Sequence, residues 1–327
     1  MGCANMCVFC NQRSISGKQC FNRDNVRDDI EKALGTISPD ASVEIAYFGG
    51  SFTGIDRELM VYLLDVAKSF VDNHREDRAR VDGIRLSTRP DYIDEEIIEI
   101  LKSYPVRTIE LGLQSMSDKV LSRSGRGHNA QCAERACKLI VESGFELVGQ
   151  MMVGLPSSTL ADELETAEKI CQMGAVASRI YPTVVFYGTE LAKMTERGEY
   201  QMLTVEEAVY RSAKVLKVFR KHGVDCIRIG LCASDNLSDE GQVMGGANHP
   251  ALGELIEGEL FYEEMCELLD RADLTNGRNV RFSVPKAHLS RAIGQRGRNR
   301  QRLIEKYNLG KIIFEEKDVS QLSLTLI

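Results

Sequence analysis

Short runs of apolar and β-branched residues alternate with segments of helical period along most of the chain. The strand candidates lie at 43–48, 84–88, 106–113, 145–153, 179–186 and 224–231. The helical segments lie at about 25–36, 57–72, 94–103, 130–143, 160–173 and 204–221. This alternation predicts an α/β fold, a parallel sheet wrapped by helices that is either open and doubly wound or a whole or partial barrel.

Polar and glycine residues follow several of the expected strands. The first strand is followed by Gly49-Gly50-Ser51, and later strand ends carry Ser87, Glu110, Gln114 and Gly154-Leu155-Pro156. Because chemistry in parallel α/β folds lies at the carboxyl ends of the strands, we expect a site at this edge. Paired glycines let a ligand approach the backbone closely, and carbonyl groups exposed there accept hydrogen bonds from an ammonium group.

The amino-acid composition indicates the broad class of protein. The chain has 327 residues, of which 43% are hydrophobic and 27% charged, and this balance excludes a disordered tail, a collagen-like repeat and a small disulfide scaffold. No run of about 18 uncharged apolar residues is present, and the N-terminus lacks the order of a secretory signal. We therefore expect a globular protein of the cytoplasm.

The charge is distributed unevenly. The formal net charge is −7, yet the window from Arg278 to Lys306 holds nine Lys or Arg and one acid, which makes it +8 and leaves −15 for the rest. A basic segment on an acidic body favours a polyanionic partner that binds at one end, and the alternative is a solvated charged helix face. The acidic run from Glu254 to Glu267 is expected to be the exposed face of a connecting helix.

Three of the ten cysteines stand in the pattern CxxxCxxC at Cys3, Cys7 and Cys10. A zinc site needs four ligands, and only Cys20 lies near enough in sequence to add a fourth. An iron–sulfur cluster held by three thiolates keeps one iron free for a substrate, and three cysteines on one tight loop suit that geometry. Phe9, just before the third cysteine, is expected to shield the cluster from water. The cysteines at positions 132, 137, 171, 226, 232 and 266 are interpreted as buried thiols.

The segment Cys3–Cys10 resembles the cluster loop of the radical S-adenosylmethionine (radical SAM) superfamily, and Tyr47-Phe-Gly-Gly-Ser-Phe-Thr53 resembles its glycine motif. The resemblance implies a partial TIM-type (β/α)6 barrel, with a 4Fe-4S cluster on Cys3, Cys7 and Cys10. It also implies that Gly49, Gly50 and Ser51 lie at the methionyl amino group of SAM.

From Cys3 to about residue 262 the chain is similar to the subfamily of the Elongator catalytic subunit. The matching segments begin at Tyr47, Ser87, Glu110, Arg126, Val153 and His249, and they occur in the same order. Anaerobic coproporphyrinogen oxidases are the group most easily confused with it. By position, the resemblance implies polar contacts to SAM from Ser87, Gln114, Arg126 and Gln150, with Tyr181 and Pro182 near the adenine.

Two features depart from the subfamily pattern. Only Met1 and Gly2 precede the first cluster cysteine, so the strand that normally leads into this loop is expected to be missing. The acetyltransferase-like domain of Elongator catalytic subunits is also not expected here, which puts the full carboxymethylation reaction in doubt. The expected organisation is a barrel at 1–240, a connecting helical segment at 241–272 and a small basic α+β module at 273–327.

In that module a strand at 280–284, a helix at 286–293, the loop Gly294-Gln295-Arg296-Gly297, a helix at 298–307 and a strand at 311–315 are expected. This order resembles the core of a KH domain, whose Gly-x-x-Gly loop clamps the backbone of single-stranded nucleic acid. Gln295 and Arg296 offer donors to phosphate, and Arg298 and Arg300 begin the following helix, whose N-terminus favours anions.

These features together predict a radical SAM enzyme that generates a 5′-deoxyadenosyl radical from SAM and acts on RNA, with tRNA as the expected class. A reduced ferredoxin or flavodoxin is the expected electron donor. Two alternatives stay open: a small-molecule radical SAM enzyme of the coproporphyrinogen oxidase type, and a non-catalytic iron–sulfur RNA-binding protein. The first has no use for the basic module, and the second has none for Gly49-Gly50.

Overall fold

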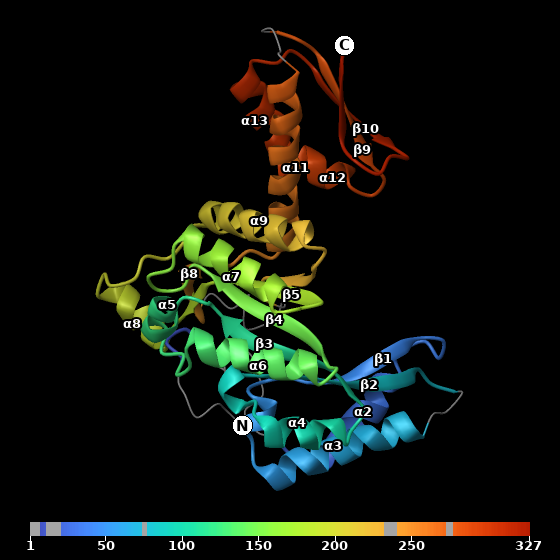
Figure 1. The fold of residues 1–327 in the computed structure, drawn as a ribbon. Helices are drawn as coiled ribbons and strands as arrows, with labels where there is room; N and C mark the ends of the chain where they lie inside the picture. Colours follow the sequence, from blue (N-terminus) through green and yellow to red (C-terminus); the bar gives the residue numbers. More distant parts are fainter. Residues whose placement is uncertain (1–6, 11–20, 74–76, 232–240, 273–276) are drawn as a thin grey trace. The chain divides into compact units, whose positions relative to one another are not determined.

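The computed structural model describes residues 7–10, 21–73, 77–231, 241–272 and 277–327 (Figure 1). The chain folds into two compact units, the first formed by Met1–Leu203 with Val218–Gly246 and the second by Thr204–Lys217 with Ala247–Ile327. The domain boundaries expected from the sequence, which divide the chain into 1–240, 241–272 and 273–327, stay a proposal. The expected absence of a strand before the cluster loop concerns residues outside the described part.

Six parallel strands form the sheet of the first unit, in the order β1-β2-β3-β4-β5-β7. They are β1 (Ser42–Tyr47), β2 (Arg80–Thr88), β3 (Val106–Gln114), β4 (Glu146–Val153), β5 (Ala177–Pro182) and β7 (Asp225–Ile229). The order follows the chain, as right-handed strand–helix–strand connections produce. This confirms the α/β class and the six-stranded partial barrel.

Helices join these strands. They are α2 (Val26–Leu34), α3 (Arg57–Asp72), α4 (Glu95–Lys102), α5 (Asp118–Arg123), α6 (Ala130–Glu142), α7 (Leu160–Gln172), α8 (Glu190–Glu196) and α9 (Val205–Lys221). Side chains that accept from the first turn fix several starts: Asp56 begins α3, Asp94 begins α4, and Thr159 with Asp162 forms a capping box on α7. These signals are local, which is why the boundaries agree with the sequence pattern within about two residues.

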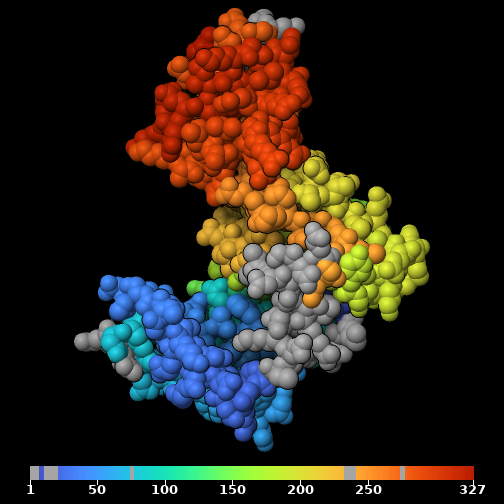
Figure 2. Space-filling view, turned by 180° about the vertical axis from the view of Figure 1, so that it is seen from behind, coloured from blue at the N-terminus to red at the C-terminus, as the bar shows by residue number. Residues whose placement is uncertain are grey.

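The two faces of the sheet differ in chemistry. Ile84 and Leu86 of β2 are fully buried on the face that packs on the helices, where the Tyr47 hydroxyl also donates to the Leu63 carbonyl of α3. Figure 1 shows α3, α4, α6 and α7 on this side of the sheet. The alternate residues, such as Arg85 and Ser87, point to the opposite face. Figure 2 shows that side from behind, with a hollow whose floor carries atoms of the blue and green parts of the chain.

One segment that the sequence predicts as a single strand forms two strands in the structure. The run 179–186 divides into β5, which ends at Pro182, and β6 (Val184–Phe186), which pairs antiparallel with β8 (Val243–Gly246) in a separate two-stranded sheet. Pro182 has no N–H for the ladder, and the next amide, that of Thr183, donates to the Val153 carbonyl at the end of β4. The chain therefore leaves the main sheet after Thr183, and from Val184 onward it pairs with β8.

The second unit combines part of α9 with α11 (Leu252–Arg271), β9 (Val280–Pro285), α12 (Leu289–Ile293), α13 (Arg298–Tyr307), β10 (Ile312–Lys317) and β11 (Ser323–Leu326). Its sheet has the order β10-β9-β11, with β10 parallel and β11 antiparallel to β9. Its core is built around the fully buried Phe282, Leu303 and Met265. The expected order of strand, helix, Gly-x-x-Gly loop, helix and strand is present, and β11 is an addition. No helix in the described part of the chain has the length and apolarity needed to cross a membrane.

Candidate functional site

The described part of the cluster loop is a turn fixed on both sides. The Cys10 amide donates to the Cys7 carbonyl at 3.0 Å, and Val8 bonds to Ser124 through its amide and to Leu191 through its carbonyl. Cys7 is buried, whereas Cys10 is exposed. Cys3 lies outside the described residues. The turn thus holds two thiols on one short segment, as a shared metal site requires.

Phe9 makes apolar contacts next to the two described cysteines of the loop. It packs partly buried against the apolar cluster of Val185, Leu191 and Tyr200 on β6, α8 and the segment that follows. Its position anchors the loop on the first unit, and a role as a shield over a cluster stays a prediction.

Gly49 and Gly50 leave an open space directly after β1. Their φ angles are +107° and +142°, a region that L side chains rarely adopt, and a Cβ atom on either would meet no atom within 4 Å. The pair is therefore needed for the backbone path and not for packing against neighbours. Ser51, which follows, is buried. This is the arrangement expected where a ligand approaches the main chain.

At the end of β3, Gln114 and Arg126 meet beside Cys7. Gln114 has φ +66°, which is uncommon for a non-glycine residue. A Cβ on Gly112 would lie 2.8 Å from Gln114 Nε2 and 3.0 Å from Arg126 Nη2, so a larger residue would push the ends of these two side chains away from their present positions. Arg126 Nη1 donates to Cys7 Sγ at 3.3 Å. The structure therefore brings three predicted site residues, Cys7, Gln114 and Arg126, to one place.

A second group of predicted residues forms around Glu110. Gln150 Nε2 donates to Glu110 Oε2 at 2.9 Å and approaches Ser87 Oγ at 3.5 Å. Glu110 is fully buried, and it accepts two hydrogen bonds from Arg179 and one from Arg85. A buried carboxylate is tolerated only when it is paired and hydrogen-bonded in this way. Ser87 and Gln150 thus belong to a network whose arginines, Arg85 and Arg179, were not predicted from the sequence.

Arg179 links this network to Tyr181 and Phe48. The guanidinium lies 5.6 Å from the ring centroid of Phe48, which is 53% exposed just before the glycine pair. Burial raises the pKa of the Tyr181 hydroxyl, which also interacts with Arg179. A feature of the sequence could have revealed Arg85, Glu110 and Arg179. Each alternates with apolar residues along its strand, which places all three on the same face of the sheet as Ser87 and Gln150.

Charged groups behind Arg126 are paired with one another. Arg89 donates to both carboxylate oxygens of Asp91 and, through Nη2 at 2.5 Å, to the carbonyl oxygen of Arg126. Burial and then the Arg126 charge lower the pKa of His128 to about 4, so this imidazole is neutral near pH 7. For Asp91, burial acts to raise the pKa, but the hydrogen bonds from Arg89 lower it overall.

The Gly294–Gly297 loop of the second unit has a strained path. Gly294, Arg296 and Gly297 all have positive φ, of 77°, 54° and 76°. A Cβ on Gly294 would lie 2.9 Å from the Asn299 backbone nitrogen, so a larger residue would displace the start of α13. Gln295, Arg296, Arg298 and Arg300 are exposed. The loop therefore presents polar side chains and a close backbone to solvent.

The basic charge of this unit is partly neutralised. Among the nine cations, at least five form ion pairs: Arg281, Lys286, Arg291, Arg298 and Arg302. The acidic run on α11 is not simply exposed, because Glu259 binds Arg302 with both oxygens and Glu263 binds Lys214. Arg296, Arg300 and Lys306 form no ion pair with a described residue, and these cations remain available for a partner.

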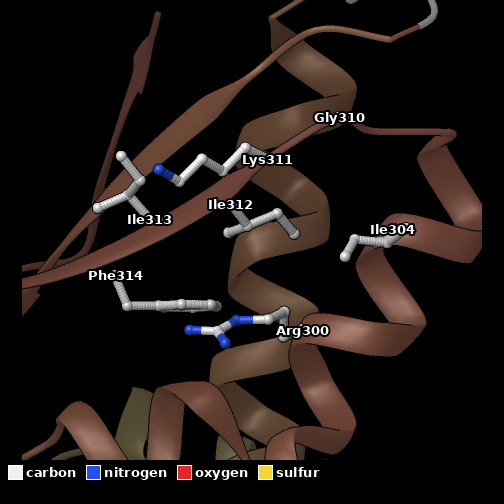
Figure 3. A pocket seen from close by; sticks show the side chains of 7 residues that line it. All are labelled: Arg300, Ile304, Gly310, Lys311, Ile312, Ile313 and Phe314. Atoms are coloured by element: carbon white, nitrogen blue, oxygen red, sulfur yellow. The ribbon is translucent and has the colours of Figure 1, made fainter.

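An open pocket of about 550 Å³ lies between α13 and β10 (Figure 3). Ile304 and Ile312 point toward each other across it, and the Arg300 side chain lies beside the ring of Phe314, 5.4 Å from its centroid. Gly310, Lys311 and Ile313 complete the lining. An apolar floor with cations at its side suits a planar group that carries negative charge nearby.

The thiols of Cys7 and Cys10 have the chemistry that an iron–sulfur cluster needs. The third expected ligand, Cys3, lies outside the described residues. Within residues 7–10, 21–73, 77–231, 241–272 and 277–327, no group of three or more His, Cys, Asp or Glu is placed to hold a metal ion. Cys7 and Cys10 supply thiols, Arg126 offers a cation to the first, and Gly49-Gly50 leaves free space at the same strand edge. These observations agree with a thiolate-bound cofactor next to a small ligand.

Comparison with known proteins decides the family. Residues 1–170 match the radical SAM superfamily, and residues 176–262 match the Radical_SAM C-terminal domain. The chain belongs to the radical SAM superfamily. Radical SAM enzymes use SAM together with a 4Fe-4S cluster, in agreement with the resemblance found in the sequence.

Several relatives are similar to the radical SAM part. The chain is 30% identical over 214 residues to Uncharacterized protein MJ0486 of Methanocaldococcus jannaschii, covering 63% of each protein. It is 28% identical over 210 residues to tRNA uridine(34) acetyltransferase of Methanocaldococcus infernus, covering 58% of this chain and 39% of the relative. The chain thus spans less than two thirds of these curated relatives.

Among solved structures, an N-terminally shortened Elp3 of the archaeon Methanocaldococcus infernus matches with a TM-score of 0.62. The identity is 24%, and the match covers 74% of this chain and 57% of that one. At this identity the likeness shows the fold, a radical SAM barrel of the kind found in Elp3.

Proposed function

We propose that this protein is a radical SAM enzyme that modifies RNA, with tRNA as the substrate class. The observation that carries the proposal is the meeting of Cys7, Gln114 and Arg126 beside the end of β3, on a chain whose second unit presents an exposed Gly-x-x-Gly loop. Support for tRNA comes from the relative named tRNA uridine(34) acetyltransferase. An RNA ligand explains the second unit, which a small-molecule radical SAM enzyme does not require.

We propose that Cys3, Cys7 and Cys10 hold the cluster and that the SAM site extends from Gly49-Gly50 to Tyr181. When bound, the cluster supplies an electron that cleaves SAM and yields a hydrogen-abstracting radical. The protein's own part is to bind, orient and exclude water. Gly49 and Gly50 leave room for the methionyl group, and Ser51 follows them in the same motif.

The remaining polar residues complete this site. Arg126 contacts Cys7, and Gln114 lies near Arg126 beside Gly112, where a carboxylate would be matched by the guanidinium. Gln150 is oriented by Glu110 and approaches Ser87 Oγ, and Tyr181 interacts with Arg179, so these contacts exist before a ligand arrives. Preorganisation of this kind lowers the cost of ordering side chains around the bound molecule. We propose a reduced ferredoxin or flavodoxin as the electron donor.

For RNA, we propose contacts from Gly294, Gln295, Arg296, Gly297, Arg298 and Arg300. The loop's positive-φ residues bring the backbone close to a phosphate, and Arg296 and Arg300 are not neutralised by a described acid. The pocket between α13 and β10 offers Phe314, Ile304 and Arg300 to a base next to that phosphate (Figure 3). Stacking on a ring and a guanidinium is tolerant of base identity, so sequence choice is not expected to reside here.

The cluster is tested by anaerobic reconstitution. The wild-type protein is expected to bind about four irons, and Cys3→Ala, Cys7→Ala and Cys10→Ala are each expected to lose the visible absorbance of the cluster. Cys132→Ala and Cys171→Ala are controls, because these thiols lie on α6 and α7 and not in this loop. A variant lacking all three loop cysteines that retains its iron would refute the site.

RNA binding is tested by a charge reversal in the loop. Gln295→Asp with Arg296→Asp is compared with Gln131→Asp with Lys138→Asp on α6, which changes charge by the same amount at exposed positions. The loop pair is expected to weaken binding of total tRNA by at least about tenfold more than the α6 pair, because acids then face phosphate. Equal affinity of the two variants would return the second unit to an unassigned role. Nucleoside mass spectrometry of RNA from a deletion strain then identifies the modified base.

A further inference from the structure

The buried side chain of Arg126 contacts the sulfur of Cys7. It is only 5% exposed, its Nη1 donates to Cys7 Sγ at 3.3 Å, and its Nη2 donates to the Gly112 carbonyl oxygen. Its Nε makes no hydrogen bond with a described residue although it is buried. The guanidinium is thus a buried cation whose contacts include the sulfur of a predicted cluster ligand.

The contact is built into the fold at both partners. Arg89 Nη2 donates to the Arg126 carbonyl oxygen, and Asp91 holds Arg89 with two hydrogen bonds. On the other side, the Val8 amide next to Cys7 donates to the Ser124 carbonyl at 3.1 Å. Segment 124–126 therefore fixes the thiol and the guanidinium together, and the missing side chain of Gly112 makes the space that the guanidinium occupies.

Arg126 places a positive charge directly at the Cys7 sulfur. Behind it, Arg89 and Asp91 are paired with each other, so their charges offset. His128 adds no charge near pH 7, because burial lowers its pKa to about 4. A cluster gains one negative charge when it is reduced, and a cation or a hydrogen-bond donor at its sulfur stabilises that form. In a buried place this interaction is screened weakly.

We propose that Arg126 is a positioning residue for the cluster, which it holds through Cys7 and whose reduction it makes easier. This rests on the cluster site proposed above and is separate from a contact between Arg126 and SAM. The role is electrostatic, so it acts on the reduction of the cluster even when no substrate is bound.

The test measures how readily the reconstituted cluster is reduced in the full-length protein without SAM or RNA. The ratio of reduced to oxidised cluster is read by electron paramagnetic resonance at one fixed, buffered potential. Arg126→Met removes the cation and both donors, and the ratio is expected to fall by about tenfold or more. Arg126→Lys keeps the charge but loses the planar fork that bridges Cys7 and Gly112, and a fall of about threefold is expected.

Arg123→Met is the matched control. Arg123 ends α5 three residues earlier, is half exposed and pairs with Glu199, so its loss is expected to leave the ratio unchanged. The proposal is overturned if Arg126→Met and Arg126→Lys reduce like the wild type, or if their effect arises only when SAM is added. If Arg126→Met takes up no iron, Arg126→Lys decides alone by the same criterion. A wild type that takes up no iron refutes the proposed cluster site itself, and this inference with it.

Discussion

The glycines at 49, 50 and 112 meet two distinct needs of the site. Gly49 and Gly50 adopt backbone angles that other residues rarely adopt and leave empty space beside them, whereas Gly112 allows Gln114 and Arg126 to approach. A substitution at the first pair therefore acts on a ligand, and one at Gly112 acts on the protein's own side chains. The difference can be measured.

Gly50→Val is expected to weaken SAM binding by at least about tenfold, which is about 1.4 kcal/mol, because the side chain projects into the open space. Isothermal titration of the reconstituted protein measures this. Gly223→Val is the control, since Gly223 also has a positive φ, +69°, and an open surrounding, but lies in the turn between α9 and β7. Similar losses in the two variants would show that backbone strain alone explains the effect.

His128 predicts a dependence of stability on pH. Its pKa is about 4 in the folded protein and about 6.5 when unfolded, so between these values only the unfolded chain takes up the proton. Stability is thus fully present above pH 6.5 and falls as the solution is acidified toward pH 4. From pH 7 to pH 5 the loss attributable to His128 is about 2 kcal/mol.

Urea unfolding of the wild type and of His128→Gln at pH 7 and pH 5 isolates this contribution. The difference between the two proteins is expected to shrink by about 2 kcal/mol at the lower pH, because the variant has no imidazole to protonate. His222, which is exposed on the helix side and contacts Glu168, provides the control His222→Gln. A constant difference between wild type and His128→Gln would contradict the neutral buried form.

Sequence reasoning located the polar residues of the site but not their partners. Ser87 and Gln114 could be placed at strand ends because the strand period is a local property, and Gln150 was given by the family resemblance. Glu110 could not be assigned, since its role depends on Arg85 and Arg179, which lie on other strands and 25 or more positions away. Pairing across a sheet is set by register, which a single sequence does not reveal.

At the scale of elements, the boundaries of the long helices were predicted best, and several short helices and strands were not predicted. The expected helices at 57–72 and 204–221 agree with α3 and α9 almost to the residue. The short helices α5 and α8 and the strand β8 were not expected, because they have too few residues to show a period. The division of 179–186 into two strands depends on Pro182, whose effect is decided by where the neighbouring amides find partners.

Asn299 joins three helices of the second unit. Its Nδ2 donates to Gly258 O of α11 at 2.8 Å and to Ala292 O and Arg291 O of α12, and its side chain is buried. Asn299→Asp replaces this donor with an acceptor that faces three carbonyl oxygens. We expect a loss of about 3 kcal/mol or more in the stability of this unit, measured by urea unfolding, together with a loss of tRNA binding.

Asn73→Asp is the matched control for Asn299→Asp. Asn73 donates to one carbonyl oxygen, that of Ser69, at an exposed position, so its loss is expected to cost less than about 1 kcal/mol. Iron content after reconstitution is expected to be normal in both variants. Equal stability of the two would show that Asn299 does not hold the helices together.

At the scale of the whole molecule, positive charge is concentrated between Arg278 and Lys306, and RNA binding should reveal it. Within the basic window, Arg296, Arg300 and Lys306 form no ion pair with a described residue. If these three contact phosphates, the logarithm of the association constant should fall against the logarithm of salt with a slope of about −2, at roughly −0.7 per contact.

Arg300→Met is expected to make that slope shallower by about 0.7, as measured by filter binding across a salt series. Arg271→Met on the last turn of α11 is the control, because Arg271 pairs with Glu267. A slope that both substitutions change equally would point to general charge and not to this surface.

The central claim is that this chain cleaves SAM at its own cluster and does so for RNA, and one measurement addresses it most directly. The reconstituted protein is reduced with dithionite in the presence of SAM, with and without total tRNA, and 5′-deoxyadenosine is quantified by chromatography. We expect formation that depends on the three loop cysteines and rises when tRNA is added. A protein that carries a full cluster and binds SAM, yet yields no 5′-deoxyadenosine with or without tRNA, would contradict the account.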